Sequence, residues 1–527
     1  MPEIRYKFMD FANYTRRKTS TTHVGKLDIG SDYPIRIQTM ANTSTNDIEG
    51  SVAQALRCRE AGAELLRFTT QGVREVESLK QIHALLAPQV GDSLPLVADV
   101  HFQANVADEA AKVVEKVRVN PGNYIDPARK FKHIDYTDEE YAAELQRLRE
   151  RFTAFLAICR EHHTAVRLGV NHGSLSDRIM SRYGDTPAGM VESVMEFLRV
   201  AVSEQFMDIV ISIKASNTRV MVDTVRLLVK QMDKEQMAFP LHLGVTEAGE
   251  GEDGRVKSAV GIGALLAEGI GDTIRVSLSE APEAEIPVAR ALRDYFADPQ
   301  SARYTSATCE VKGGVVCYAS EVSDWSLFAL HAAAECGRLL WTNDAKQIEL
   351  HNPHFGAEEL ERLGKDILQA AGVMRYKTEF VSCPGCGRTL FGLEETIAAI
   401  KAAFREAEKE HTYLRTLKIG VMGCIVNGPG EMADADYGYV GAARGKVSLY
   451  KGKTCIRMNI PQEQAVQELI EFIEGERPTP GPSLKGREEK EAYPQPISGA
   501  ERRSPLLFPF ELPSRGNSPS EGKGVEC

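Results

Sequence analysis

The sequence predicts an α/β protein: a TIM (β/α)8 barrel, then a small inserted α/β segment, then a C-terminal α+β domain. Three observations support this prediction. Strand-like and helical patterns alternate through residues 1–296, the alternation stops between 297 and 378, and a second compact group of patterns occupies 379–475. With 527 residues the chain is also too long for one ordinary domain. We therefore expect three domains with these boundaries, followed by a tail over 476–527.

Eight short runs of apolar and β-branched residues mark the expected strands of the barrel. They begin at Ile35, Glu64, Leu94, Val114, Thr164, Asp208, Pro240 and Asp272. Between them lie amphipathic stretches with apolar residues at helical spacing, such as DIEGSVAQALRCREAG and TRVMVDTVRLLVKQM. Eight strand–helix units in a segment of this length are typical of a TIM barrel. A doubly wound open sheet is the alternative, but no G-x-G-x-x-G follows the first strand.

The remaining segments are assigned from their local patterns. The charged amphipathic stretch within 124–163 predicts an elongated outer helix. In the inserted segment, GGVVCYAS and RLLWTNDAKQIEL predict strands and WSLFALHAAAEC predicts a helix between them. In the C-terminal domain, KIGVMGCIVNGPGE and KVSLYKGKTCIRMNI predict strands, and LEETIAAIKAAFREAEKEH and QEQAVQELIEFIEG predict helices. The tail is rich in Pro, Gly, Ser and charge, which predicts disorder.

Composition excludes several classes of function. The formal net charge of −11 argues against nonspecific binding to nucleic acid. No stretch approaches the roughly 20 apolar residues that cross a bilayer, and the N-terminus lacks the apolar core of a signal peptide. We therefore expect a cytoplasmic protein that does not bind membranes. In such a chain the 10 cysteines are not expected to form a disulfide framework, and Cys58 and Cys159 lie in helical patterns where cysteine is usually a small core residue.

The active site of a TIM barrel lies at the carboxyl ends of its strands, and this sequence places many polar residues there. Five of them are cations: Arg67, Arg118, Arg167, Lys214 and Arg275. The other polar residues near strand ends are Asn42, Asp99, His101, Asn120, Asn171, His172, Asn217 and Ser277. Any single cation could be a salt-bridged part of the scaffold. Five cations in one mouth repel each other unless an anion neutralises them, and guanidinium groups match phosphate oxygens, so a diphosphate is the expected ligand.

Glu247 differs from these residues in the sign of its charge. It lies in TEAGEGEDGR, at the end of the seventh predicted strand. It can balance the charge of the neighbouring arginines, or it can transfer a proton to a substrate oxygen. The residues alone leave both roles open.

Three cysteines stand apart from the others. Cys383 and Cys386 form CPGC, and Cys424 lies in the glycine-rich GCIVNGPGE. A C-x-x-C turn is common to zinc, iron–sulfur and redox dithiol sites. A third cysteine in a glycine-rich turn favours a metal centre over a dithiol, because such turns let backbone amides approach sulfur. Cys455 competes as a fourth ligand, but KTCIRMNI predicts a strand in which it is a core residue. Zinc remains the alternative metal.

Together these motifs resemble the 4-hydroxy-3-methylbut-2-enyl diphosphate synthase family of the non-mevalonate isoprenoid pathway. The resemblance covers residues from about Pro34 to Phe296 and from about Glu379 to Gly475. It rests on the ordered motifs IQTMANTSTND, LPLVADVHF, VRVNPGN, VRLGVNHGSLSDRIM, IKASN, LHLGVTEAGEGEDG, GIGDTIRVSL, VSCPGCGR and VMGCIVNGPGE.

The resemblance implies an iron–sulfur oxidoreductase. Its reaction is the two-electron reductive ring opening and dehydration of 2-C-methyl-D-erythritol 2,4-cyclodiphosphate to 4-hydroxy-3-methylbut-2-enyl diphosphate. It implies one 4Fe–4S cluster with the ligands Cys383, Cys386, Cys424 and Glu431. The substrate-binding residues that it implies are Arg67, His101, Arg118, Arg167, Asn171, Lys214, Arg275 and Ser277. It makes Glu247 the proton donor, and it suggests flavodoxin or ferredoxin as the electron donor.

The segment 124–163 and the motifs NHGSLSDRIM and TEAGEGEDG resemble the large form of the family, which carries an additional domain before the cluster domain. Here the inserted segment is much shorter than a full extra barrel, which implies a reduced version. The short form closes its active site across a homodimer, and the large form can differ, so both arrangements stay open. Two other classes also remain: a non-redox barrel lyase or transferase with a structural zinc, and a non-enzymatic cluster carrier.

Overall fold

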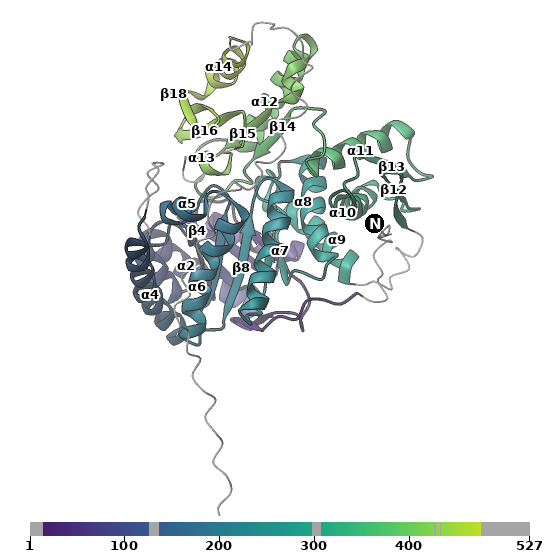
Figure 1. Cartoon of the computed structure of the whole chain (residues 1–527). Coiled ribbons are helices and arrows are strands. Elements are labelled where there is room, and N and C mark those ends of the chain that lie inside the picture. The colour runs from purple at the N-terminus through teal and green to yellow at the C-terminus, as the bar shows by residue number, and fades with distance from the viewer. Residues whose placement is uncertain (1–13, 126–135, 298–306, 426–427, 433, 476–527) are drawn as a thin grey trace, which may run out of the picture. The chain divides into compact units, whose positions relative to one another are not determined.

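The computed structural model describes residues 14–125, 136–297, 307–425, 428–432 and 434–475 (Figure 1). Its described residues up to Phe472 belong to one compact unit. The predicted disordered tail over 476–527 lies outside the described residues. No helix in the described ranges is both long enough and apolar enough to cross a membrane.

Eight parallel strands form the barrel, and each coincides with a strand predicted from the sequence. They are β3 (Arg36–Met40), β4 (Leu65–Thr70), β5 (Leu96–Val100), β6 (Lys116–Val119), β7 (Ala165–Asn171), β8 (Ile209–Lys214), β9 (His242–Leu243) and β10 (Thr273–Ile274). Their order is β8-β7-β6-β5-β4-β3-β10-β9. A parallel bridge between Ile211 and Leu241 joins β8 to β9 and closes the circle. The prediction of a TIM barrel is therefore confirmed.

Helices surround these strands (Figure 1). They are α1 (Ile48–Ala61), α2 (Val73–Val90), α3 (Ala104–Ala111), α4 (Asp138–Glu161), α5 (Asp177–Tyr183), α6 (Pro187–Ser203), α7 (Thr218–Lys234), α8 (Gly251–Leu266) and α9 (Pro282–Ala297). The predicted elongated outer helix is α4, which begins with a reciprocal capping box between Thr137 and Glu140. Its buried side chains include Phe152 and Phe155, so it packs against the barrel.

A short hairpin that the sequence did not predict covers one end of the barrel. Its strands are β1 (Thr22–Val24) and β2 (Leu27–Ile29). Val24 and Ile29 are fully buried against Leu65, Val97 and the first residues of other barrel strands. These contacts lie at the amino ends of the strands, opposite to the end that carries the cationic side chains.

The inserted segment contains one small sheet and two helices. Its elements are β11 (Thr308–Lys312), β12 (Val315–Ala319), α10 (Trp325–Asn343), β13 (Gln347–His351) and α11 (Ala357–Ala370). One prediction was wrong here: RLLWTN is not a strand but the last turns of α10. Its leucines Leu339 and Leu340 continue the buried face of that helix, which ends only at Asp344 in a left-handed conformation. Only QIEL pairs as a strand, parallel to β12.

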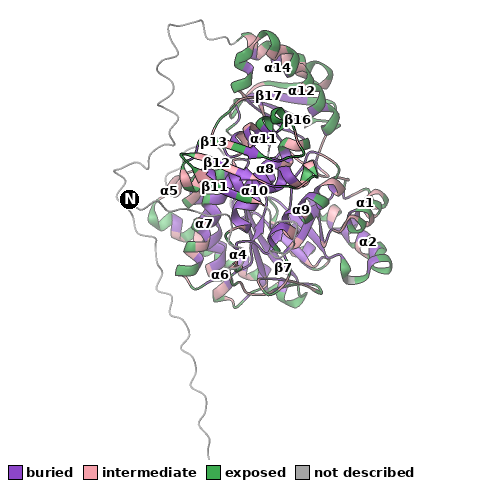
Figure 2. Ribbon diagram, turned by 90° about the vertical axis from the view of Figure 1, so that its right-hand side faces the viewer, coloured by how far each residue is buried: buried purple, intermediate pink, exposed green. Residues whose placement is uncertain are grey.

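The insert packs on the flank of the barrel through α8 and α10, both largely buried (Figure 2). A Cβ atom on Gly263 would lie 2.5 Å from the Cβ of Ala334, and one on Gly337 would lie 2.8 Å from Cγ1 of Val260. Small residues thus let the two helices approach closely. Because α8 is covered by the barrel on one side and by α10 on the other, it is apolar around most of its circumference rather than along one stripe.

The C-terminal domain is a mixed sheet with helices, which confirms the predicted α+β class. Its strands are β14 (Glu379–Ser382), β15 (Lys418–Met422), β16 (Tyr437–Ala443), β17 (Lys446–Lys451) and β18 (Thr454–Pro461), and they pair in that order. The first three are parallel and the last three antiparallel. Its helices are α12 (Leu393–Glu410), α13 (Gly428–Glu431) and α14 (Gln462–Gly475). The sequence analysis had not predicted β14 and β16.

Candidate active site

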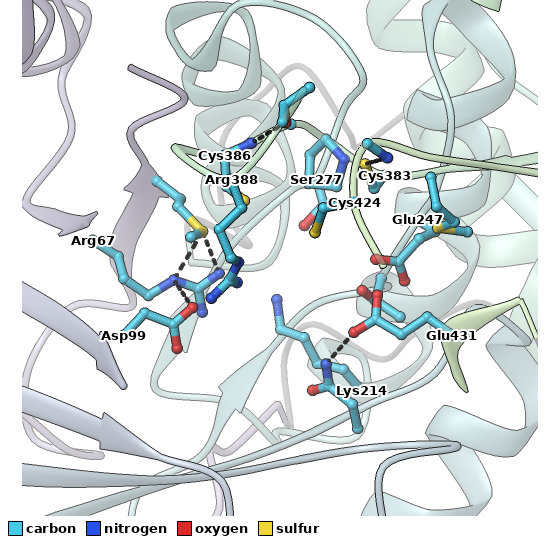
Figure 3. A pocket seen from close by; sticks show the side chains of 18 of the residues that line it. Arg67, Asp99, Lys214, Glu247, Ser277, Cys383, Cys386, Arg388, Cys424 and Glu431 are labelled. Atoms are coloured by element: carbon cyan, nitrogen blue, oxygen red, sulfur yellow. Dashed lines mark hydrogen bonds and ion pairs between the residues drawn. The ribbon is translucent and has the colours of Figure 1, made fainter. Parts of the chain in front are cut away.

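A single cavity is lined by the carboxyl ends of the barrel strands on one side and by two loops of the C-terminal domain on the other (Figure 3). Every residue that the family resemblance assigned to the site lines it: Arg67, His101, Arg118, Arg167, Asn171, Lys214, Glu247, Arg275, Ser277, Cys383, Cys386, Cys424 and Glu431. Of the other polar residues noted near strand ends, Asp99 lines the cavity, whereas Asn42, Asn120, His172 and Asn217 do not. All of these side chains belong to one chain. The cavity therefore brings the predicted anion site and the predicted metal ligands together.

Arg67 and Arg118 share the carboxylate of Asp99. Arg118 donates from Nη1 to Asp99 Oδ1 at 2.9 Å, and Arg67 Nε lies 3.8 Å from Asp99 Oδ2. Burial alone would raise the pKa of Asp99, but Arg67 and Arg118 outweigh it and hold that pKa well below its usual range. Arg118 also donates to the carbonyl of Gly169. A Cβ on that glycine would lie 2.4 Å from Arg118 Nε, so only glycine leaves room for this guanidinium.

Arg275 is held by a carboxylate of its own. Its Nε and Nη2 donate to the two oxygens of Glu285 at 3.0 and 2.9 Å, and both side chains are buried. Glu285 also accepts hydrogen bonds from the hydroxyl of Thr39 and the backbone of Leu278. The sequence analysis allowed that any single cation could be a salt-bridged part of the scaffold, and for Arg275 that role accounts for most of its contacts.

Arg167 and Lys214 are different, because neither forms an ion pair within the described part of the chain. Arg167 is 1% exposed; its Nε donates to Ser212 Oγ at 2.9 Å, while its Nη1 has no hydrogen-bond partner there. Burial, followed by the charges of neighbouring cations, lowers the pKa values of Arg167 and Lys214 well below their usual range. Buried cations without a counter-ion are costly. An anion in the cavity would remove that cost.

His101 lies beside this group as a neutral imidazole. Burial and the charge of Arg118 lower its pKa to about 4, even though Asp99 lies 3.5 Å from its Nε2. The ring contacts Nη1 of Arg118. A neutral histidine adds a hydrogen-bonding group to the site without adding to the repulsion among the arginines.

Glu247 lies in the loop between β9 and α8, and it faces Glu431 (Figure 3). It is 3% exposed, its Oε2 has no hydrogen-bond partner among the described residues, and its φ of 48° is unusual for a residue with a side chain. Burial and the neighbouring Glu431 raise the pKa of Glu247 well above its usual value. Strained backbone of this kind often occurs at functional sites.

Glu431 belongs to α13 and contacts the barrel directly. Asn171 donates from Nδ2 to Glu431 Oε1 at 2.6 Å. The loops that carry the two residues meet at Gly173 and Gly430, where a Cβ on Gly173, with φ of 82°, would lie 2.1 Å from the carbonyl oxygen of Gly430. The glycine in the NHG motif thus permits the contact that holds this glutamate at the mouth.

Two neighbouring parallel strands position the cysteines. Ser382 at the end of β14 pairs with Val421 of β15, so Cys383 and Cys424 leave the same edge of the sheet. The amide of Gly423 donates to Cys383 Sγ at 3.2 Å, and the amide of Cys386 donates to Thr389 Oγ1. Burial raises the pKa of the Cys383 thiol.

The donor set around the cavity fits an iron–sulfur cluster. Three soft sulfur ligands and a carboxylate converge on it, and a backbone amide points at one of the sulfurs. Among the residues that the structure describes, no three His, Cys, Asp or Glu side chains come close enough to hold one metal ion. A cubane cluster spreads its ligands further apart, because each iron takes a ligand of its own. Cys455, the competing ligand, lies in β18 and does not line the cavity.

Barrel loops fix the cysteine loop in place. Ser279 donates to the carbonyl oxygen of Cys383 at 2.9 Å, and a parallel bridge joins Ala248 to Ser382. Lys257 of α8 donates to Glu379 at 2.9 Å, where β14 begins. Sequence reasoning missed these contacts, and it also missed Arg388, which lines the cavity two residues after Cys386 within the VSCPGCGR motif. Its position in that motif was the available signal.

Comparison with known proteins identifies the same two domains, the barrel and the C-terminal domain. A family model described as the GcpE TIM-barrel domain matches residues 19–290, and one described as the GcpE protein C-terminal domain matches residues 379–475. The chain belongs to the GcpE family. A relative from Bacteroides thetaiotaomicron, named 4-hydroxy-3-methylbut-2-en-1-yl diphosphate synthase (flavodoxin), is 47% identical over 89% of this chain and 99% of its own length. A relative from Picosynechococcus, whose name specifies ferredoxin, is 43% identical over 88% of this chain and 93% of its own.

The GcpE models leave residues 291–378 unmatched, a range that includes the whole insert. The alignment with the Bacteroides relative spans 616 positions, more than the 527 residues of this chain, so that relative contains segments that this chain lacks. The exact boundaries predicted for the domains stay a prediction. Among GcpE family members, this chain combines the barrel and the C-terminal domain with a compact insert on the barrel flank.

Proposed function

We propose that this chain catalyses the two-electron reductive ring opening and dehydration of 2-C-methyl-D-erythritol 2,4-cyclodiphosphate to 4-hydroxy-3-methylbut-2-enyl diphosphate. The observation that carries the proposal is one cavity in which buried cations, without counter-ions among the described residues, face three cysteines. The first group suits a diphosphate and the second suits a redox metal centre. A barrel lyase needs no such thiols, and an electron carrier needs no cationic mouth.

The barrel residues bind the cyclic diphosphate. Arg167 and Lys214 lack counter-ions within the described residues, so phosphoryl oxygens complete their coordination. Arg118 and Arg67 are turned toward the same space by Asp99. Because the guanidinium groups are held by the strands before substrate arrives, little conformational entropy is lost on binding.

The reaction takes up two electrons and two protons: one carbon–oxygen bond of the ring breaks, leaving the diphosphate on the other end, and one hydroxyl leaves as water. Glu247 gives the proton to that hydroxyl. Its support is positional, since a buried carboxyl group with an unpartnered oxygen lines the cavity next to the cysteine loop. Asn171 orients Glu431 beside it.

One 4Fe–4S cluster held by Cys383, Cys386, Cys424 and Glu431 would supply the two electrons, one at a time. The names of the relatives support flavodoxin or ferredoxin as the protein that delivers them. The contacts of Ser279 and Lys257 with the C-terminal domain support an active site completed within one chain, so that a homodimer is not needed to assemble it.

Anaerobic purification followed by metal, sulfide and activity assays tests this function. We expect a brown protein with about four irons and about four sulfides per chain. With dithionite and a viologen dye it should convert the cyclodiphosphate to the linear diphosphate, detected by mass spectrometry, and the dye removes dependence on the protein donor. A colourless, zinc-containing protein without reductant-dependent turnover would instead identify a non-redox barrel enzyme.

A further inference from the structure

Among the described residues that line the cavity, Arg388 is the one cation that comes from the C-terminal domain rather than from the barrel. It lies two residues after Cys386, on the turn that carries the CPGC cysteines. Its side chain extends from that turn toward Arg67 and Asp99 of the barrel (Figure 3). It is 8% exposed, although it crosses from one domain to the other.

The guanidinium of Arg388 is only partly satisfied by its surroundings, which include the side chains of Cys386 and Asp99. Neither its Nε nor its Nη1 has a hydrogen-bond partner within the described residues, and no carboxylate there forms an ion pair with it. Asp99, a carboxylate whose charge acts on Arg388, is already bound by Arg118. Arg388 is also close enough to Arg67 and His101 for its charge to lower the pKa values of both. Arg388 thus offers two buried, unpartnered donor atoms from which an anion in the cavity can accept hydrogen bonds.

We propose that Arg388 binds a phosphoryl oxygen of the substrate from the C-terminal side and so completes the diphosphate site that the barrel begins. This inference rests on the proposed function, because it names a further binding residue of the same cavity. Through Arg388 the bound anion contacts both domains at once. The loop that carries Cys383 and Cys386 is then held at the barrel mouth by the substrate itself, in addition to the contacts from Ser279 and Lys257.

The planar fork of arginine explains why this residue type suits the position. Two of its donors can reach two phosphoryl oxygens in one plane, whereas the single ammonium of lysine acts as a point charge. The unpartnered Nε and Nη1 lie on different edges of the guanidinium, so their N–H groups diverge toward oxygens that are further apart than those of one phosphoryl group. Arg388 therefore contributes most to ligands with two phosphoryl groups and less to a single phosphate.

A second role is physically available to Arg388, and the experiment must separate it from the first. Its charge interacts with Cys386 and Cys424 as well as with Asp99. In that role the arginine would stabilise the negative charge of the metal ligands and would not touch the substrate. Its removal would then change the iron content or the reduction potential and leave anion affinity unaltered.

The test compares Arg388→Met and Arg388→Lys with the parent protein, all purified anaerobically with their iron. Isothermal titration with inorganic pyrophosphate measures anion affinity independently of turnover, and iron and sulfide analysis follows the metal centre. We expect Arg388→Met to weaken pyrophosphate binding about tenfold to a hundredfold, the scale of a charge-assisted hydrogen bond, with iron retained. Arg388→Lys should recover part of that loss, and titration with orthophosphate should show a smaller difference between the variants.

Arg405→Met is the matched control, since Arg405 is an exposed arginine of α12 in the same domain and lies outside the cavity. It should bind pyrophosphate as the parent does. Unchanged affinity in Arg388→Met, or loss of iron from both Arg388 variants, overturns the inference. Arg167→Met, titrated alongside, separates this from the proposed function. If Arg167→Met weakens binding and Arg388→Met does not, only the inference about Arg388 fails; if neither does, the barrel is not the diphosphate site.

Discussion

The two faces of the cavity hold their side chains differently. On the barrel face, charged side chains extend from strands and are bound by neighbouring side chains. On the C-terminal face, the cysteines lie on turns. Asp99 orients Arg118, Ser212 orients Arg167, and Glu285 holds Arg275. The sulfur of Cys383 is approached by backbone amides, those of Gly423 and Gly385. The barrel face is thus pre-organised by side-chain partners, whereas the cysteine face is held through backbone contacts of its loop.

This contrast predicts that changes on the cysteine face remove function altogether. Cys383→Ala, Cys386→Ala and Cys424→Ala should each lose the iron–sulfur cluster and all reductant-dependent turnover, because no other side chain replaces a missing thiolate. Iron and sulfide analysis of anaerobic protein measures this. Cys455→Ala and Cys58→Ala, both outside the cavity, should keep their iron. A full cluster in any of the first three would remove that residue from the ligand set.

Glu247 lies where the two faces meet, and its replacement should affect the chemistry rather than the assembly. Glu247→Gln keeps the shape and hydrogen bonding but removes the transferable proton, so turnover should fall by about 10²–10⁴-fold while pyrophosphate affinity and iron content persist. Glu252→Gln, at the half-buried start of α8 and outside the cavity, is the control and should keep its rate. A normal rate in Glu247→Gln would leave Glu247 only the charge-balancing role.

Two arginines of the barrel face should respond in opposite ways. Arg167→Met removes a buried cation without a counter-ion, so pyrophosphate affinity should fall about tenfold to a hundredfold with little loss of folding stability. Arg275→Met leaves Glu285 buried and unpaired, which should lower the free energy of unfolding by about 3–5 kcal/mol. Titration and chemical denaturation distinguish the two. Equal losses of stability would mean that Arg167 is also scaffold.

The insert should contribute to stability and not to chemistry. Gly263→Ala places a methyl group 2.5 Å from the Cβ of Ala334, so the free energy of unfolding should fall by about 1–3 kcal/mol. Gly364→Ala on α11 is the control: its Cβ would meet Ile348 at an ordinary 3.8 Å, and stability should stay level or rise by up to about 1 kcal/mol. Neither change should alter turnover. A fall in turnover in Gly263→Ala would link the insert to the active site.

The sequence predictions were accurate where a short stretch of residues indicates the structure by itself, and they failed where packing between distant elements decides it. The eight barrel strands were found because buried parallel strands are continuous apolar runs, and β3 to β10 all lie in such runs. The strand predicted at RLLWTN failed because an apolar stretch of that length fits either a strand or the end of a helix, and packing of α10 against α8 decides between them. β14 is short and β16 is rich in glycine, so neither gave a clear pattern.

The sequence by itself determined which residues gather around the cavity, because strand ends and cysteine turns are local features that spacing and residue type mark. It also determined that the barrel mouth is cationic. Only the tertiary structure decided how those residues are used: Glu285 takes up Arg275, Asn171 holds Glu431, and Arg388 crosses from the cysteine loop into the barrel. Glu285 lies only 10 residues after Arg275, but the pairing needs the start of α9 to fold back onto the end of the eighth barrel strand. The other two contacts depend on which loop of the C-terminal domain faces which loop of the barrel, and Asn171 and Glu431 are 260 residues apart, beyond the reach of any local pattern.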